Sequence, residues 1–263
     1  MKKPQPVALI CAGKLTDTPL TRLRGLVERL GPVSSSSLRV ASRVVNTLRA
    51  GYPVSDYAAF QDCGVVLLSV PDASAGDFVG DLAQADLVWS GKFVVLFSTL
   101  LESDTLAALA AAGAHTISLC AVSGFDGRLF LVEGERAGMA AVRPLLPDRD
   151  VKLVHVPSGH KALYLAAAAC TGPLLASVLI CAGECLKLAG LAASDASRIM
   201  LVQAQKTTRA FINAGKKMYQ EPPDLERQIA VLRARKPEIA QFFEQSAKLA
   251  GGIAGEPGRV LQK

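Results

Sequence analysis

The sequence is poor in aromatic residues, which make up only 5% of its 263 positions, although half of all residues are apolar. The core must therefore be built mainly from Ala, Leu and Val. This composition favours an α/β or helical fold over a β-sandwich. A chain of this length forms one or two domains, and we expect two.

Motifs of several protein classes are also missing. The chain has no G-x-S-x-G sequence, which argues against a hydrolase with a nucleophile elbow. It has no G-x(4)-GK[ST] sequence, which argues against a P-loop nucleotidase. The net charge of +6 comes from scattered Lys and Arg without interleaved aromatics, so we expect no nucleic-acid partner. A small anionic ligand fits this charge equally well.

The six cysteines contain no Cys-x-x-Cys pair, and most lie in apolar runs. This pattern predicts buried thiols in a reducing compartment and hence a cytoplasmic protein. Cys181 and Cys185 are one helical turn apart, but no nearby His or third Cys completes a ligand set. We therefore predict no metal site. The apolar stretch from Val7 to Ala12 is too short for the core of a signal peptide.

Strand-like and helix-like segments alternate through the first 150 residues. This order predicts a Rossmann-type α/β domain with a parallel sheet, covered by helices on both faces. The expected strands are residues 7–11, 38–41, 64–72, 93–97, 116–120 and 129–132, and the expected helices are 20–30, 57–60, 73–82 and 103–112.

Beyond about His155 the strand signals vanish, so the remainder is expected to be all-helical. The predicted domains are residues 1–154 and 155–250, followed by a flexible tail, 251–263. Residues 162–183 form 22 consecutive positions without charge, which is long enough to cross a bilayer. Because many of them are Ala and Gly172-Pro173 interrupts them, we expect a buried helix at an internal or subunit interface and no membrane contact. A membrane span is the alternative.

The turn after the first strand is a candidate cofactor site. A dinucleotide fingerprint places glycines here so that the backbone can approach the pyrophosphate at a helix N-terminus. The residues are Ala12, Gly13, Lys14 and Leu15, and only the middle glycine is present. Gly13 would admit the pyrophosphate and Lys14 would neutralise it. The alternative is a tight turn with no ligand.

The end of the second strand selects the cofactor, because an acid there binds the ribose hydroxyl of NAD, whereas an Arg accommodates the 2′-phosphate of NADP. The predicted strand at 38–41 ends at Ser42 and Arg43, with no acid. If a dinucleotide binds, the sequence favours NADP. A solvated arginine at a strand end is the alternative.

These segments together resemble Rossmann-like oxidoreductases of the 6-phosphogluconate dehydrogenase-like superfamily, relatives of pyrroline-5-carboxylate reductase. The resemblance is carried by residues 7–13, 40–43, 65–72, 110–119 and 161–168 and extends roughly over 5–215. It implies an NADP-binding domain, a helical domain that forms a homodimer, and a substrate cleft between them.

The resemblance also implies roles for particular residues. Ser69, Val70, Pro71 and Asp72 would line the nicotinamide side of the cofactor, and Ser98 stands where the family often has Ser-Gly. Lys161 and Tyr164 would face the cleft from the start of the first long helix.

Reduction of a carbonyl or imine needs a proton donor as well as a hydride source. Lys161 and Tyr164 lie three residues apart on one helix face, so either could donate that proton. The sequence thus predicts an NADP-dependent oxidoreductase acting on a small carbonyl or imine compound. The alternative is a non-catalytic protein that binds a nucleotide or a partner, because the outer glycines of the fingerprint are missing.

Overall fold

The computed structural model describes residues 5–12, 23–146 and 150–255, and it divides into two compact units, 1–168 and 169–263. The first unit contains one sheet of eight strands in the order β3-β2-β1-β4-β5-β6-β7-β8. The strands are β1 (Val7–Cys11), β2 (Leu30–Ser34), β3 (Tyr52–Pro53), β4 (Val65–Ser69), β5 (Phe93–Phe97), β6 (His115–Ala121), β7 (Leu129–Gly134) and β8 (Lys152–Val156).

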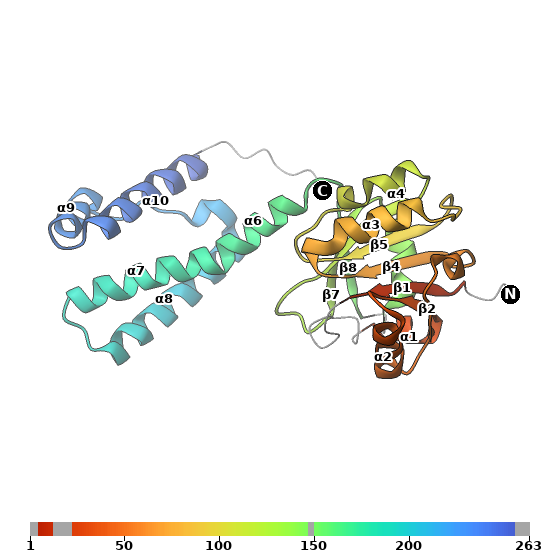
Figure 1. The fold of residues 1–263 in the computed structure, drawn as a ribbon. Helices are drawn as coiled ribbons and strands as arrows, with labels where there is room; N and C mark the ends of the chain where they lie inside the picture. Colours follow the sequence, from red (N-terminus) through yellow and green to blue (C-terminus); the bar gives the residue numbers. More distant parts are fainter. Residues whose placement is uncertain (1–4, 13–22, 147–149, 256–263) are drawn as a thin grey trace. The chain divides into compact units, whose positions relative to one another are not determined.

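Among the described residues of this unit, five short helices accompany the sheet: α1 (Arg24–Arg29), α2 (Leu38–Leu48), α3 (Ala75–Gln84), α4 (Ala107–Ala111) and α5 (Gly138–Val142). Single 3₁₀ turns occupy Tyr57–Phe60, Asp72–Ser74, Ser103–Leu106 and Arg143–Leu145. Helices α3 and α4 cover one face of the sheet and α1 and α2 cover the other (Figure 1). The Rossmann-type α/β domain is confirmed.

Alternation along each strand produces two cores, one on each face of the sheet. In β1, for example, Val7 and Leu9 belong to the core under α1 and α2, whereas Ala8 and Ile10 belong to the core under α3 and α4. All five residues of β1 are buried because a strand in the centre of a covered sheet has no solvent face.

Two expectations about the sheet are wrong. Strand β7 pairs antiparallel with β6, because the short connection between them forms a hairpin rather than a helical crossover. Residues 38–41 are the start of helix α2, and the second strand is Leu30–Ser34. The helix forms because Ala41, Val44 and Leu48 recur at helical spacing and are buried on one face. Ser37 caps it by accepting a hydrogen bond from the Val40 N–H at 3.3 Å.

The second unit is helical throughout its described residues, 169–255. The helices are α6 (Lys161–Thr171), which begins in the first unit, α7 (Pro173–Leu188), α8 (Ala193–Ala214), α9 (Leu225–Arg235) and α10 (Pro237–Gly255), with a 3₁₀ turn at Gly215–Met218. The division between the units falls within α6, later than the predicted boundary at 154, because the start of α6 is hydrogen-bonded to the sheet. Residues 251–255 of the expected tail are helical, and 256–263 lie outside the described residues.

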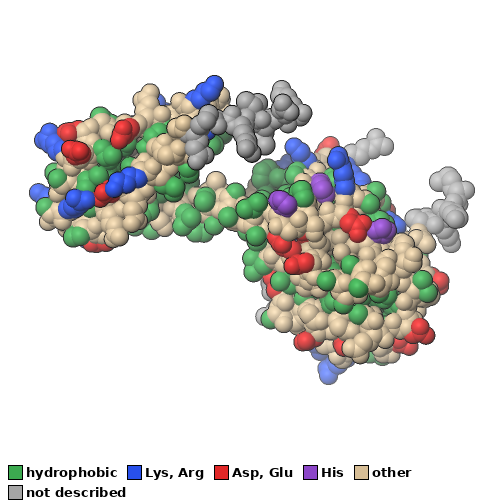
Figure 2. All heavy atoms as spheres, turned by 90° about the horizontal axis from the view of Figure 1, so that it is seen from above, with side chains coloured by type: hydrophobic (Ala, Val, Ile, Leu, Met, Phe, Trp, Pro, Cys, Tyr) green, Lys and Arg blue, Asp and Glu red, His purple; other side chains and the backbone are tan. Residues whose placement is uncertain are grey.

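The uncharged segment, residues 162–183, forms most of α6 and α7. By length and composition Lys161–Leu188 could cross a membrane, and none of its most apolar window is buried. Figure 2 shows the start of this segment as hydrophobic and neutral spheres without charged side chains. The expectation that this helix is buried inside the chain is therefore wrong. Packing against another molecule stays a prediction.

Candidate functional site

The carboxyl ends of β1 and β4 define the place where this sheet can bind a ligand. The chain runs from β1 to β2 on one side and reaches β4 on the other, so the strand order reverses beside β1. Ligands of such sheets bind in the crevice at this switch point. Here Ala12 follows β1, and its N–H donates to the Ser69 carbonyl at the end of β4 at 3.1 Å. Gly13, Lys14 and Leu15 lie outside the described residues.

Ser42 and Arg43 lie inside helix α2 and not at a strand end. The Ser42 hydroxyl donates to the Leu38 carbonyl at 2.8 Å, as serines in helices commonly do. The strand-end argument for these two residues therefore fails.

The residues that do follow β2 are a run of serines and the first turn of α2. The Ser35 hydroxyl donates to the Cys11 carbonyl at 2.5 Å, which ties the end of β2 to the end of β1. Ser36 and Arg39 are exposed beside it, and no Asp or Glu occurs from Ser34 to Ala41. Hydroxyls, a guanidinium and the N-terminus of an 11-residue helix are donors that suit a phosphate.

The loops after β4 and β5 are joined by side chains. The Ser98 hydroxyl donates to Asp72 Oδ1 at 2.7 Å, and it accepts from the Leu100 and Leu101 N–H groups at 3.1 and 2.9 Å. Ser69 and Val70 are buried, Asp72 is half-buried and Pro71 is exposed. The structure therefore brings the predicted residues Ser69–Asp72 and Ser98 together at one edge of the sheet.

Lys161 is fully enclosed at the start of α6, with 1% of its surface exposed. Its Nζ donates to the Ser98 carbonyl at 2.7 Å, the Leu101 carbonyl at 2.6 Å and the Ser118 hydroxyl at 2.8 Å. An ammonium has three protons to donate, so all of them are used within the protein. Burial lowers the pKa of Lys161, while the negative charge that Cys120, Glu133, Asp72 and Glu102 carry when deprotonated opposes that change.

A buried carboxylate that the sequence argument missed lies on β7. Glu133 accepts from the Ser103 N–H at 2.7 Å, the Ser103 hydroxyl at 3.0 Å and the Gly159 N–H at 3.0 Å. Gly159 adopts φ +75°, a left-handed turn that suits glycine. Glu102 holds the next turn, because its Oε1 accepts from the Ala162 N–H at 2.8 Å. The start of α6 is thus fixed to the loop after β5, to Ser118 within β6 and to Glu133 of β7.

Tyr164 and Cys120 lie next to this cluster. Burial raises the pKa of the Cys120 thiol, and the Lys161 charge and the Thr99 side chain partly offset that rise. Burial and the nearby Cys120 raise the pKa of Tyr164. At neutral pH both groups are therefore protonated, and the half-buried Tyr164 hydroxyl is a candidate proton donor.

Among the residues that the structure describes, no three His, Cys, Asp or Glu side chains come together in a way that could hold a metal ion. The described part of the site therefore consists of hydroxyls, amides, one enclosed ammonium and carboxylates that are already hydrogen-bonded. Such a set can position an organic ligand and supply a proton.

Comparison with known proteins agrees with this geometry. Residues 4–120 match the model of the Rossmann-like domain. The chain therefore carries a Rossmann-like domain over the part that holds the strand ends β1 to β6. No curated protein matches the sequence.

Solved structures share the fold over nearly the whole chain. A protein from Bacteroides fragilis, provisionally named as an NADP oxidoreductase, has a TM-score of 0.69 at 16% identity, covering 94% of this chain and 98% of its own. An imine reductase from Aspergillus terreus, solved with NADPH4 and dibenz[c,e]azepine, has a TM-score of 0.61 at 13% identity, with 98% and 89% covered. An imine reductase from Myxococcus stipitatus, solved with NADP+, has a TM-score of 0.59 at 15% identity, with 95% and 91% covered. This chain has the same fold as these reductases.

Proposed function

We propose that this protein is an NADP-dependent oxidoreductase that reduces the C=N or C=O bond of a small molecule. The observation that carries the proposal is the donor set after β2, which suits a phosphate and contains no acid. The shared fold supports it, because structures with this fold hold NADPH or NADP+. The imine reductase from Aspergillus terreus was solved with dibenz[c,e]azepine, an imine, and a reductive aminase of the same fold was solved with ethyl levulinate, a keto ester, which supports the substrate class.

In this proposal Ser36 and Arg39 hold the 2′-phosphate at the N-terminus of α2, while Ser35 ties this loop to the end of β1. This set replaces Ser42 and Arg43, which the helical turn places further along α2. Gly13, Lys14 and Leu15 would adjoin the pyrophosphate, and Ser69 to Asp72 with Ser98 would line the nicotinamide. When bound, the cofactor supplies the hydride.

The protein supplies a proton and an ordered site. Tyr164 Oη gives its proton to the substrate nitrogen or oxygen and regains one from solvent, and its raised pKa keeps it protonated until that step. Lys161 acts as a positioning residue, because its three hydrogen bonds join the loop after β5 to Ser118 within β6. Its predicted role as the alternative proton donor to Tyr164 would require one of these bonds to break.

Tyr164→Phe tests the proposed reaction. The wild-type protein is expected to oxidise NADPH in the presence of a cyclic imine or a keto ester. The variant should lose about 100-fold in kcat with an unchanged Kd for NADPH, because only the proton donor is removed.

Tyr57→Phe is the matched control, because Tyr57 is also half-buried and burial together with Asp81 also raises its pKa. It should leave kcat unchanged. NADPH binding without turnover on any carbonyl or imine would favour the alternative of a non-catalytic binding protein.

We further propose that the protein works as a cytoplasmic homodimer joined through the uncharged α6–α7 segment. Leu163, Leu174, Leu175 and Ile180 all lie exposed on it, which a second copy would cover. All six cysteines are free, which fits a reducing compartment. The scattered charges favour a small-molecule partner over nucleic acid.

A further inference from the structure

The helical unit contains a cavity that the proposed reductase chemistry does not use. Its volume is about 670 Å³, which lies in the range of sites for small organic molecules. Helices α7, α8, α9 and α10 all contribute to its wall. The lining residues are Val178, Cys181, Ala182, Cys185, Leu186, Met200, Gln203, Asp224, Arg227, Gln228, Val231, Leu232, Ile239, Phe242 and Phe243.

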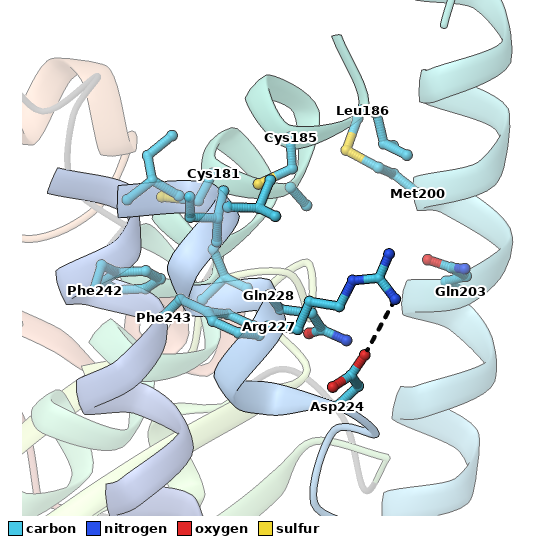
Figure 3. Close-up of a pocket in the computed structure, with 15 residues that line it drawn as sticks. Cys181, Cys185, Leu186, Met200, Gln203, Asp224, Arg227, Gln228, Phe242 and Phe243 are labelled. Carbon is cyan, nitrogen blue, oxygen red and sulfur yellow. Dashed lines mark ion pairs between the residues drawn. The ribbon is translucent and has the colours of Figure 1, made fainter. Parts of the chain in front are cut away.

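Most of the wall is apolar, and the polar groups gather in one part of it. Figure 3 shows Phe242 and Phe243 from α10 on the side of Cys181, while the Arg227 guanidinium is directed across the opening toward the Gln203 amide on α8. An apolar chamber with a few convergent polar groups is the usual form of a ligand site.

The polar groups keep unused hydrogen-bonding capacity. Arg227 meets Asp224 only at 3.7 Å, so most of its five N–H donors remain available. Gln228 donates through Nε2 to the Pro223 carbonyl at 2.7 Å, which leaves its Oε1 as an acceptor. Within the described residues, the Gln203 side chain has no hydrogen-bond partner. A carboxylate would satisfy donors from Arg227 and Gln203 together.

We propose that this cavity binds a small amphipathic carboxylate, with its apolar, preferably aromatic, body against Phe242 and Phe243 and its head group at Arg227 and Gln203. The aromatic side chains offer stacking partners for such a body. The exposed Arg227 guanidinium places a positive charge at the rim of the cavity, which favours an acidic head group over an apolar one. This site belongs wholly to the helical unit and does not depend on cofactor binding or turnover.

Two cysteines in the wall provide a direct readout. Cys181 and Cys185 line the cavity, whereas Cys170 is exposed on α6 and outside it. We would alkylate the intact protein with iodoacetamide and follow each thiol by peptide mass spectrometry, with and without 4-phenylbutyrate. At ten times its Kd the probe should slow modification of Cys181 and Cys185 about tenfold and leave Cys170 unchanged.

Arg227→Gln tests the assignment of the head group, and it is expected to raise the Kd for 4-phenylbutyrate about fivefold. Binding of the uncharged 4-phenyl-1-butanol should not change in that variant. Arg209→Gln, an exposed arginine of α8 that does not line the cavity, is the control and should leave both probes unaffected.

Three results would overturn the proposal. The first is no protection of Cys181 and Cys185 by either probe. The second is equal protection of Cys170, which would indicate general adsorption to apolar surface. The third is that iodoacetamide modifies Cys181 and Cys185 when the chain is monomeric but not at protein concentrations at which it is oligomeric. That result would assign the cavity to a second copy. A lack of reductase activity would leave the expected protection pattern unchanged.

Discussion

The two units of this protein differ in how far they bury their apolar residues. The Rossmann unit encloses two continuous cores on the faces of one sheet, and it even buries charged groups such as Lys161 and Glu133. In the described part of the helical unit, 169–255, the buried residues are only Ala196, Ile229, Ile239 and Ala240. The first unit therefore encloses most of its own apolar side chains, whereas the described part of the second leaves many of them exposed.

This difference separates two kinds of site. The strand ends of the Rossmann unit carry pre-arranged hydrogen bonds, so their geometry does not depend on a ligand. The helical unit has a cavity and an exposed apolar segment, for which the occupants proposed above are a small carboxylate and a second copy of the chain. Substitutions should therefore act on folding in the first unit and on association in the second.

The largest effect is expected for Lys161→Met. Removing the ammonium leaves three acceptors without their donor and Glu133 without its nearby opposite charge, so the Rossmann unit should lose about 3 kcal/mol of its free energy of unfolding. Urea unfolding followed by fluorescence of Trp89 measures this unit selectively, because the chain has one tryptophan and it is buried there. Lys152→Met, at an exposed lysine of β8, should change the value by less than about 0.5 kcal/mol. Equal effects of both substitutions would show that the enclosed ammonium has no special part in the fold.

The next largest effect is expected in the uncharged α6–α7 segment, the proposed dimer interface. Ile180→Arg places a charge on α7 at a position that is 67% exposed within the chain. If a second copy covers it, the dimer Kd should rise about 100-fold, or about 2.7 kcal/mol, while Trp89 unfolding stays unchanged. Light scattering over a dilution series measures the Kd.

Val88→Arg, at an exposed valine of the Rossmann unit, is the matched control and should leave the Kd unaltered. A wild-type chain that is monomeric at all concentrations, or that partitions into lipid vesicles, would contradict the interface.

A smaller effect follows from the buried thiol of Cys11. Burial raises its pKa from the ordinary 9.0 to about 11. Between these pH values the thiol loses its proton in the unfolded chain but keeps it in the folded chain. The free energy of unfolding is therefore highest below pH 9, and it falls as the pH rises toward 11. Over this pH interval the free energy of unfolding of the wild-type Rossmann unit should fall by about 2 kcal/mol more than that of Cys11→Ala.

Urea unfolding at a series of pH values tests this dependence on Cys11. Cys170→Ala, at an exposed cysteine, should show the same pH slope as the wild type. An unchanged slope in Cys11→Ala would contradict the assignment.

Much of the Rossmann unit could be predicted because its central strands are uninterrupted apolar runs. The strands β1, β4, β5 and β6 are buried on both faces, which produces such runs directly. Strand β2 was missed because Gly31-Pro32 is typical of a helix stop, although here Pro32 lies within the strand. Residues 38–40 alternate apolar and polar positions over a window too short to distinguish a strand from a helix.

The candidate site could be predicted only in part. The ends of β4 and β5 bring Ser69–Asp72 and Ser98 together as expected, because carboxyl ends of parallel strands share one edge. Glu133 was missed, although an acid between Val132 and Gly134 in a buried strand is itself a signal, since a buried carboxylate needs partners. The enclosure of Lys161 depends on three distant acceptors, which no local pattern reveals.

The most direct test of the proposed function is a calorimetric titration of NADPH and NADH into the wild type, Arg39→Ala and Arg43→Ala. Both arginines lie exposed on α2, but only Arg39 is in its first turn beside the serines after β2. We predict that Arg39→Ala weakens NADPH about tenfold without changing NADH, because only NADPH carries the 2′-phosphate, and that Arg43→Ala binds both as the wild type does. Failure of the wild type to bind NADPH, or a loss of NADPH affinity in Arg43→Ala alone, would contradict the proposed cofactor site.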